Sequence, residues 1–418
     1  METVDLARLQ FALTAGAHFL FVALTLGLAT LVAVIQTWAT LTRSPVHMRM
    51  TRFWGQLYII NYAMGIVTGL VMEFQLGLSW SGLTEFAGNV FGSSLAIETI
   101  VAFFIESTFL GLWIFGWNKL NRWAHLALIW VVTLTAYASA FWILISNGFL
   151  QNPVGYQLKD GVLHLTDFGA LVANPAALVA FFHIGGGALI VGGFLMAGVS
   201  AYHLAKRTAE QDFFRKSLRI GIGVALPATL FTATFGGLGF DTLQLTKLAA
   251  WSGSARRMAE VQADMVAMYG PGDYLPSLEW VRVSGITMMS LFAVLFFVSG
   301  ASFLLMLFRP VVRGFRPWHW LLTALIPVPF VTMIAGWLFR EMGRQPWAVY
   351  GLLKTADAMS PVSYGQIRFS LAAFVTVFAV LILINYWLLA RTARKGPGEV
   401  ALGDDRPAAE TPAPALTF

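Results

Sequence analysis

The sequence predicts an all-α integral membrane protein with about nine transmembrane helices, on three observations. Of its 418 residues, 57% are hydrophobic and only 11% are charged, whereas a soluble globular protein carries roughly 25% charged residues. The mean hydropathy is +0.70. The apolar residues form nine runs, and each run is long enough for the roughly 20 residues that a spanning helix needs.

The nine expected spans follow one another through nearly the whole chain. They cover residues 9–37, 54–76, 92–117, 124–149, 178–203, 217–240, 283–308, 318–340 and 367–392. They form one membrane domain, residues 1–395, whose longest connecting loop covers about residues 241–282. Residues 396–418 are rich in Pro, Ala and acidic residues, which is typical of a disordered tail.

The basic residues predict how the chain is oriented in the membrane. Most of the 27 Lys and Arg residues fall in alternate loops and in the C-terminal tail, on one side of the bilayer. Cytoplasmic loops carry the excess of Lys and Arg, so the C-terminus is predicted to be cytoplasmic and the N-terminus outside. The basic residues form no single patch, so the net charge of +6 does not indicate nucleic-acid binding.

Two absences restrict the chemistry. The chain has no cysteine, which excludes disulfides, thiolate metal ligands and covalent c-type haem attachment. No basic region followed by a cleavage site stands at the N-terminus, so no signal peptide is expected to be removed.

Charged residues stand at the outer end of the eighth span, within residues 336–347. Arg340, Glu341 and Arg344 follow about twenty apolar residues, and charge at such depth usually marks a functional site. A glutamate backed by arginines can stay ionised, and it can then ligate iron or stabilise a charged intermediate. Trp337, one turn before Glu341, is the aromatic residue most suited to line a cofactor pocket, since the others suit interfacial belts and lipid-facing surface.

Two histidines of the predicted spans are further candidate ligands. His18 follows small residues and could be an axial haem ligand, or a buried histidine hydrogen-bonded to a neighbouring helix. His183 is followed by glycines at 185–187, which could open a groove for a cofactor or allow close helix packing. With the N-terminus outside, His18, His183, Glu98 and Glu341 are expected at similar depth near the outer face.

The third span carries two carboxylates, Glu98 and Glu106. Eight residues of α-helix would place them about 12 Å apart along the axis and facing roughly the same way. This spacing suits a proton relay, with Glu106 inward and Glu98 outward; the alternative is two buried, neutral carboxyls. Ser139 and Ser107 could extend the relay, although serine in a membrane helix more often bonds its own backbone.

Several strings of the chain are specific enough to indicate a family. They are Arg8-Leu9-Gln10-Phe11-Ala12-Leu13-Thr14, Met64-Gly65 with Thr68-Gly69, Met72-Glu73-Phe74-Gln75, Phe103 through Thr108, Asn147-Gly148 with Gln151-Asn152-Pro153, and Gly343 through Trp347. On these strings, from about residue 6 to residue 394, the chain resembles the large, haem-bearing subunit of cytochrome bd-type quinol oxidases.

The resemblance implies a terminal oxidase that reduces O2 to water with electrons from a membrane quinol. It implies a low-spin haem b, a high-spin haem b, and a haem d or second high-spin haem b. His18 and Glu341 would serve the two high-spin haems, and His183 would be one ligand of the low-spin haem. Arg344 and Trp337 match residues that contact the haems.

The resemblance also assigns a proton path and partners. Glu98 would be the acid beside the oxygen-reducing site, and Glu106 and Ser139 would belong to the inward proton path. A second membrane subunit and small single-helix subunits are the implied protein partners. The implied location is the bacterial cytoplasmic (inner) membrane.

The chain departs from the family pattern on the donor side. Lys247 of the quinol loop is present, but Ser252 stands where the family has a glutamate, and the Gly-Asp pair that usually opens the loop is absent. A carboxylate can act as a base for quinol, whereas serine cannot do so at neutral pH. Lys247 and Arg282 are the candidate quinol-binding residues.

The second departure concerns the low-spin haem. Its other ligand is normally a methionine two residues after an arginine, but Arg282 is followed two residues later by Ser284. Met288 lies one turn further along the same face, with Met289 next to it, and Met288 is the candidate ligand.

Several functions remain open at this stage. The protein could oxidise quinol at a rearranged site, take electrons from another donor, or be a paralogous subunit with a different activity. From another class, it could be a non-catalytic haem-binding or ion-transport protein that uses its buried carboxylates for ion passage.

Overall fold

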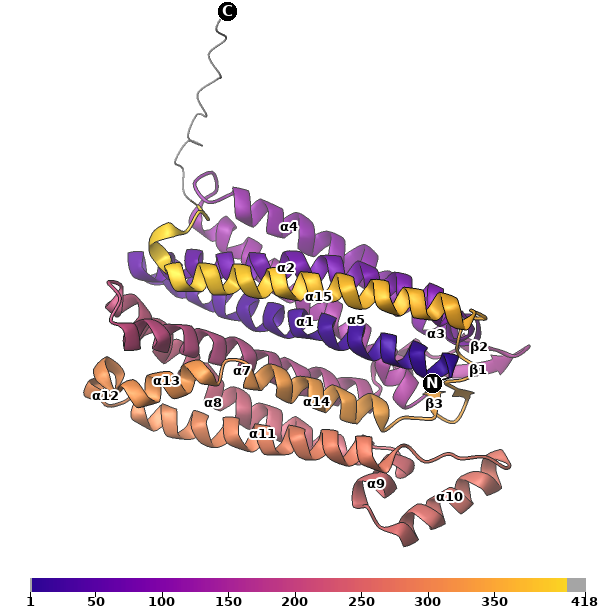
Figure 1. Cartoon of the computed structure of the whole chain (residues 1–418). Helices are drawn as coiled ribbons and strands as arrows, with labels where there is room; N and C mark the ends of the chain where they lie inside the picture. The colour runs from indigo at the N-terminus through magenta and orange to yellow at the C-terminus, as the bar shows by residue number, and fades with distance from the viewer. Residues whose placement is uncertain (1, 404–418) are drawn as a thin grey trace, which may run out of the picture.

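The computed structural model describes residues 2–403, and these contain nine helical stretches long and apolar enough to cross a membrane. The stretches run side by side in one elongated bundle (Figure 1). They are α1 (Thr3–Thr42), α2 (Pro45–Ser79), α3 to α4 (Ser81–Phe115), α5 (Arg122–Gln151), α6 to α7 (Phe168–Lys206), α8 (Gln211–Gly239), α11 (Leu278–Leu305), α13 to α14 (Arg316–Met342) and α15 (Tyr364–Lys395). The predicted all-α architecture with nine spans is confirmed.

Besides the stretch Gln211–Thr242, in which a 3-10 turn at Phe240–Thr242 follows α8, three stretches consist of more than one helical piece. The pieces are α3 (Ser81–Ile97), the π-helix η1 (Glu98–Phe103) and α4 (Phe104–Phe115); α6 (Phe168–Val172) and α7 (Pro175–Lys206); and α13 (Arg316–Ala324) and α14 (Val328–Met342). Proline stands at the start of both α7 and α14, where its missing N–H leaves no helical hydrogen bond unmade.

The connecting segments at the N-terminal end of the bundle are structured (Figure 1). They contain the antiparallel pairs β1 (Tyr156–Lys159) with β2 (Val162–Leu165) and β3 (Trp347–Val349) with β4 (Leu353–Lys354), and the segment η2 (Phe240–Thr242), α9 (Leu245–Ser252) and α10 (Ala255–Tyr269). The loop expected at about 241–282 therefore holds two helices before α11 begins. The opposite end carries α12 (Arg309–Gly314) and η3 (Pro397–Glu399).

Helix α1 is the centre of the bundle. It packs against α2, α5, α7, α14 and α15. Its crossing with α7 is a backbone-to-backbone contact, because a Cβ on Gly27 would lie 2.2 Å from the carbonyl oxygen of Ala188. Small residues allow membrane helices to approach this closely, and the crossing fixes α1 against the helix that carries His183.

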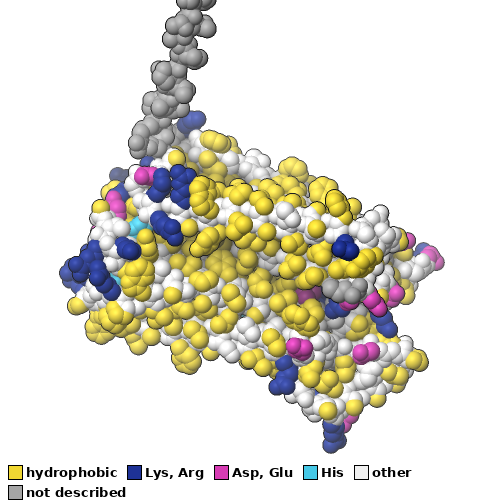
Figure 2. All heavy atoms as spheres, in the orientation of Figure 1, with side chains coloured by type: hydrophobic (Ala, Val, Ile, Leu, Met, Phe, Trp, Pro, Cys, Tyr) yellow, Lys and Arg dark blue, Asp and Glu magenta, His cyan; other side chains and the backbone are white. Residues whose placement is uncertain are grey.

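The surface agrees with a membrane-spanning bundle. Figure 2 shows hydrophobic side chains over the middle of the bundle, while Lys and Arg side chains gather at the end that carries α12 and the end of α15. The positive-inside rule makes this end cytoplasmic, and the orientation stays a prediction.

Residues 396–403 differ from the expectation of a disordered tail at 396–418. They turn back onto the bundle, where Leu402 is buried and lies beside Gly55 and Trp113. The N–H of Ala401 donates to Gln56 Oε1 at 3.0 Å. Composition predicted disorder because it contains no information about the apolar surface of α2 and α4 against which Leu402 packs. Residues 404–418 lie outside the described part of the chain.

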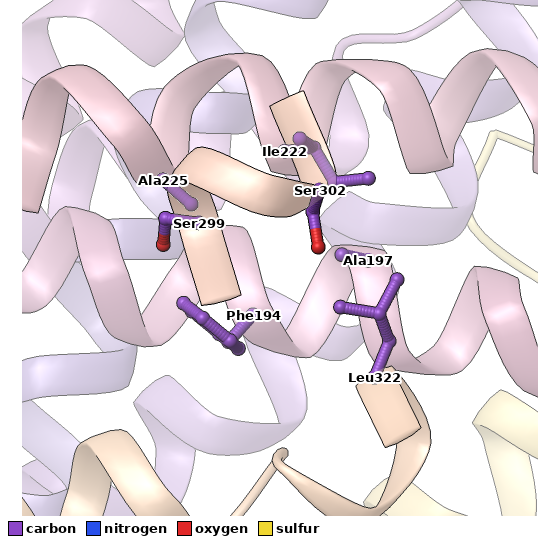
Figure 3. Close-up of a pocket in the computed structure, with 7 residues that line it drawn as sticks. All are labelled: Phe194, Ala197, Ile222, Ala225, Ser299, Ser302 and Leu322. Atoms are coloured by element: carbon purple, nitrogen blue, oxygen red, sulfur yellow. The ribbon is translucent and has the colours of Figure 1, made fainter. Parts of the chain in front are cut away.

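A small cavity of about 10 Å³ lies between α7, α8, α11 and α13. Two serines, Ser299 and Ser302, are among the residues that line it (Figure 3). Ser302 Oγ accepts a hydrogen bond from Trp318 Nε1 at 3.0 Å, whereas Ser299 Oγ has no partner within residues 2–403. The cavity has about the volume of one water molecule's probe sphere, which is far too small for a cofactor.

Candidate functional site

The environment of His18 fixes its tautomer. His18 Nδ1 on α1 lies 2.9 Å from Thr68 Oγ1 on α2. The Thr68 hydroxyl donates its proton to backbone carbonyls one turn earlier, at Met64 and Gly65, both at 3.0 Å. Thr68 Oγ1 must therefore accept from His18 Nδ1–H. The lone pair of the ring is left on Nε2, the nitrogen that can bind a metal.

His183 on α7 is held in the same way. Its Nδ1 lies 3.0 Å from the carbonyl oxygen of Thr232 on α8. A carbonyl only accepts hydrogen bonds, so Nδ1 carries the proton and Nε2 has the lone pair. Metal-ligating histidines commonly donate their second ring N–H to such an acceptor. Both histidines thus have the protonation pattern that iron ligation requires.

Glycines on neighbouring helices leave space for the imidazole rings of His18 and His183. A Cβ on Gly69 of α2 would lie 3.3 Å from His18 Cε1, and a Cβ on Gly236 of α8 would lie 3.0 Å from His183 Cε1. Of the glycines that follow His183, Gly186 serves helix packing, since its Cβ would lie 2.3 Å from a threonine hydroxyl of α8. From the sequence, the space beside each histidine was expected to come from small residues on the histidine's own helix.

Glu341, at the end of α14, is surrounded by hydrogen-bond donors. Its Oε1 accepts from Asn147 Nδ2 at 2.8 Å and from Gln151 Nε2 at 3.3 Å. Its Oε2 accepts from Arg344 Nη2 at 2.5 Å, and the side chains of Arg344 and Glu341 are only 9% and 12% exposed. The carboxylate is therefore compensated by α5 and by the turn that follows α14, as a charge so little exposed to water must be.

The second arginine of the run, Arg340, supports the same carboxylate indirectly. Arg340 Nε donates to Asn147 Oδ1 at 2.7 Å, and Arg340 Nη2 donates to the carbonyl oxygen of Ala176 at 3.1 Å. Asn147 consequently bridges Arg340 and Glu341. Both arginines that the sequence placed around Glu341 are in position, and α5, α7 and α14 meet there.

Lys247 of α9 belongs to this same polar cluster. Its Nζ donates to the carbonyl oxygen of Arg340 at 3.0 Å and to Gln151 Oε1 at 3.4 Å. Burial, together with the positive charge of Arg340, lowers the pKa of Lys247 to about 7. Gln244, before α9, donates from Nε2 to the carbonyl oxygen and to Oε1 of Gln151, at 2.8 and 2.9 Å.

Three amide residues of this cluster were not expected from the sequence: Asn147, Gln151 and Gln244. Asn147 and Gln151 stood inside the matching strings, but an uncharged amide carries no hydropathy or charge signal. Their role depends on partners in other helices.

An open groove of about 950 Å³ lies beside this cluster. It is lined by Gln151, Asn152, Pro175, Ala176, Asp241, Thr242, Leu243, Gln244, Leu245, Val261, Asp264, Met265, Ala267, Met268, Tyr269 and Tyr350. Neither Lys247 nor Arg282 is in this lining. Lys247 is buried beneath the loop, and Arg282 lies against the end of α9, where a Cβ on Gly253 would be 2.9 Å from its Nη1.

Ser284 and Met288 on α11 take different roles. The Ser284 hydroxyl donates to the carbonyl oxygen of Trp280 at 2.5 Å, a bond within its own helix. The Met288 sulfur faces α14, where a Cβ on Gly336 would lie 2.9 Å from it, while Met289 is 47% exposed. Met288 is therefore the methionine that faces the interior.

Trp337 lies between α14 and α1. A Cβ on Gly16 of α1 would be 3.6 Å from its ring, so the indole stands beside the helix segment that carries His18.

Glu98 is part of a hydrogen-bonded chain between α2 and α5. Ser139 Oγ donates to Glu98 Oε1 at 2.5 Å. Thr99 Oγ1 lies 3.2 Å from Glu98 Oε2 and 2.7 Å from Glu73 Oε1 of α2. Thr99 and Glu73 were not expected from the sequence. Ser107 bonds its own helix backbone, which was the alternative to a place in the relay, because its hydroxyl donates to the carbonyl oxygen of Phe103 at 2.8 Å.

Glu106 lies in a different environment. It is buried, and its Oε1 has no hydrogen-bond partner within the described part of the chain. The regular α-helical spacing assumed between Glu98 and Glu106 does not hold, because the π-helix at 98–103 separates them. A π segment of this kind is frequent at functional sites.

Glu98 and Glu341, two of the four groups expected at similar depth, are not level. Glu98 has its partner on α5 at Ser139, and Glu341 has its partner on the same helix at Asn147. Eight residues of α-helix separate Ser139 from Asn147, so Glu98 lies about 12 Å further than Glu341 from the end of the bundle that carries α9 and α10.

Comparisons with known proteins agree on one family. The family model described as cytochrome bd terminal oxidase subunit I matches residues 6–272 and 269–397. A Bacillus subtilis (strain 168) protein, "Cytochrome bd ubiquinol oxidase subunit 1", is 36% identical over 95% of this chain and 94% of its own length. An Escherichia coli (strain K12) protein, "Cytochrome bd-II ubiquinol oxidase subunit 1", is 31% identical over 95% of this chain and 97% of its own.

A solved structure agrees as well. A chain of "The structure of bd oxidase from Geobacillus thermodenitrificans" matches with a TM-score of 0.84 and 26% identity, over 95% of this chain and 99% of that one. The matches cover nearly the full length of this chain and of each of these relatives. The chain therefore belongs to the cytochrome bd terminal oxidase subunit I family.

Proposed function

We propose that this protein is the haem-bearing subunit of a terminal respiratory oxidase that reduces O2 to water with electrons from a membrane quinol. The observation that carries the proposal is the set of His18, His183 and Glu341, two histidines with free Nε2 atoms and one buried, compensated carboxylate. Haem, when bound, supplies the electron transfer and the oxygen chemistry.

Each ligand has a proposed haem. His18 and Glu341 serve the two high-spin haems, one haem b and one haem d or second haem b. His183 serves the low-spin haem b, with Met288 as its second ligand, because the Ser284 hydroxyl is occupied within its own helix. Arg344 provides positive charge beside Glu341.

The protein's acids provide the proton supply. Glu106 receives protons from the inward side, and Glu98 delivers them on the outward side with its carboxylate oriented by Ser139. Glu106 is buried and Glu98 is half-buried, and carboxylates inside a membrane bundle are costly unless they have such a function. Thr99, between Glu98 and Glu73, offers a second exit from Glu98.

The groove is the proposed donor site. Its apolar lining, including Leu243, Val261 and Met265, suits the ring and tail of a quinol. Asp241 and Asp264 also line it, and either carboxylate can accept a proton from a quinol hydroxyl, which Ser252 cannot. Lys247 and Arg282 then support the loop rather than touch the donor.

The remaining features of the function follow the family. A second membrane subunit and small single-helix subunits are the proposed partners, and the protein resides in the bacterial cytoplasmic membrane with its N-terminus outside. Large apolar side chains on α15, such as Phe369 at 78% and Tyr386 at 71% exposed, are available to lipid or to such a subunit.

Reduced-minus-oxidised optical spectra of the purified complex test the proposal. Dithionite should reduce every haem, and a membrane quinol should produce the same bands, including a far-red chlorin-type band if haem d is present. Bands that appear with dithionite alone would favour the second candidate, a bd-type oxidase with another donor, which the loss of the loop glutamate at Ser252 suggests. A preparation without haem bands would contradict the oxidase function.

A further inference from the structure

Gln244 has one end that lacks a partner. Its side chain is only 8% exposed and lines the groove. Its Nε2 makes two hydrogen bonds to Gln151, whereas its Oε1 has no partner among residues 2–403. Buried polar atoms are nearly always hydrogen-bonded, so this oxygen is available to a hydroxyl group in the groove.

Gln151 continues the hydrogen bonds toward Glu341. Its Oε1 accepts from Gln244 Nε2 at 2.9 Å, and its Nε2 donates to Glu341 Oε1 at 3.3 Å. Gln151 is 3% exposed, so water does not compete strongly with these bonds. Three side chains from separate parts of the chain therefore connect the groove to the carboxylate.

We propose that Gln244 accepts a hydrogen bond from a hydroxyl of the bound donor and that Gln151 transmits this contact to Glu341. Gln244 is thus a binding residue and Gln151 a positioning residue. The inference rests on the proposed function, in which a quinol occupies the groove and Glu341 serves a haem.

The direction of the effect follows from polarisation along a hydrogen-bond chain. An amide whose oxygen accepts a hydrogen bond becomes a stronger N–H donor. A hydroxyl on Gln244 Oε1 therefore strengthens the Gln244–Gln151 bond, and this strengthens the Gln151–Glu341 bond in turn. The carboxylate loses electron density when the groove is filled, so any haem that it ligates senses the occupancy of the donor site.

The test uses the purified complex with its haems, reduced with dithionite under anaerobic conditions so that no turnover occurs. Duroquinol is titrated in, and its binding is measured by equilibrium retention while the optical spectrum of the high-spin haems is recorded. The variants are Gln151→Met, Gln151→Asn and Gln244→Leu. Thr234→Val on α8 is the matched control, because Thr234 is not in the groove lining and its hydroxyl bonds the carbonyl oxygen of Leu230 in its own helix.

In the unmodified complex and in Thr234→Val, saturating duroquinol is expected to shift the high-spin bands. The Gln151 variants, whose affinity for duroquinol is measured as well, should lose the shift at saturation. Gln244→Leu should bind about tenfold more weakly, the loss of one hydrogen bond, and should show no shift at saturation. Haem content is checked in each variant, and if both Gln151 variants lose haem, Gln244→Leu decides, because it does not contact Glu341.

The contrary results separate the two proposals. A full shift in the Gln151 variants, or in saturated Gln244→Leu, would overturn the relay while leaving the groove as the donor site. Unchanged binding in Gln244→Leu would overturn the relay and the groove assignment together. Duroquinol that binds the unmodified complex without any shift would also overturn the relay.

Discussion

Each candidate haem ligand owes its chemistry to residues of other helices. His18 and His183 are held as Nδ1–H tautomers by an oxygen of α2 and an oxygen of α8. Glu341 is compensated by Arg344, in the turn that follows α14, and by amides of α5. The ligand residue types and Arg344 were visible in the sequence. The partners on other helices were not, because each lies about 50 or more residues away along the chain.

Lys247 illustrates how an assignment changes at this scale. The resemblance made it a quinol-binding residue, whereas its Nζ bonds Gln151 and the backbone of Arg340 beneath the groove. Its long side chain reaches into the cluster around Glu341 and joins the donor loop to it. A motif identifies such a residue, but only its contacts show whether its side chain faces the groove or the cluster around Glu341.

The lowered pKa of Lys247 predicts a pH dependence of stability. Its pKa is about 7 in the folded protein and about 10.5 in the unfolded chain, so between these values the unfolded chain binds more protons. The unfolding free energy of the natural protein, relative to Lys247→Met, should therefore rise as pH increases from about 7 to about 10.5. Below pH 7 the difference should be constant, with the variant favoured because the natural protein buries a charge.

Thermal unfolding in detergent between pH 6 and pH 10 measures this difference. Lys159→Met on β1, which removes an exposed positive charge, controls for the change of net charge. A difference between the natural protein and Lys247→Met that stays flat across this range would refute the prediction.

At the scale of elements, hydropathy located the spans but not their internal breaks. The third span begins at Ser81 rather than near residue 92, and it contains the π-helix at 98–103. A hydropathy window averages over about twenty residues, so it cannot register a local change in hydrogen-bond pattern. Composition likewise missed α9 and α10, which are amphipathic helices within a polar loop.

The crossing of α1 and α7 predicts a sensitive glycine. Gly27→Ala should lower the unfolding free energy by about 1–3 kcal/mol, because the added Cβ collides with the backbone of α7 and forces the helices apart. Gly300→Ala on α11 is the matched control, since nothing lies within 4 Å of its Cβ. It should be neutral or slightly stabilising.

Thermal unfolding in detergent compares the two glycine variants. Equal midpoints for Gly27→Ala and Gly300→Ala would show that the crossing tolerates a methyl group and that its closeness does not contribute to stability.

At the scale of the whole molecule, the main concentration of positive charge and the candidate functional site lie at opposite ends of the bundle. The Lys and Arg side chains gather at the α12 end (Figure 2). The groove and the Glu341 cluster lie at the end that carries α9, α10 and the short strands. If the basic end is cytoplasmic, the proposed function has quinol releasing its protons outside while Glu106 takes up protons from inside. Such a separation would make oxygen reduction electrogenic without a pump.

The absence of native cysteine allows the orientation to be tested cleanly. Lys159→Cys in the β1–β2 hairpin should react with a membrane-impermeant maleimide in intact spheroplasts. Arg313→Cys near α12 should react only after lysis, because both positions are exposed but lie at opposite ends of the bundle. The reverse pattern of labelling would invert the topology and, with it, the proposed direction of proton uptake.

The sequence by itself determined the membrane class, the number of spans, the candidate ligands and the family. These are local properties, since twenty apolar residues partition into a bilayer whatever their neighbours are, and the motifs are contiguous strings. The tertiary structure alone decided the histidine tautomers, the amide cluster around Glu341, the place of Lys247, and the groove. Each of these depends on hydrogen bonds between distant segments, such as Asn147 and Glu341 at a separation of 194 residues, and only the packing of the helices brings such partners together.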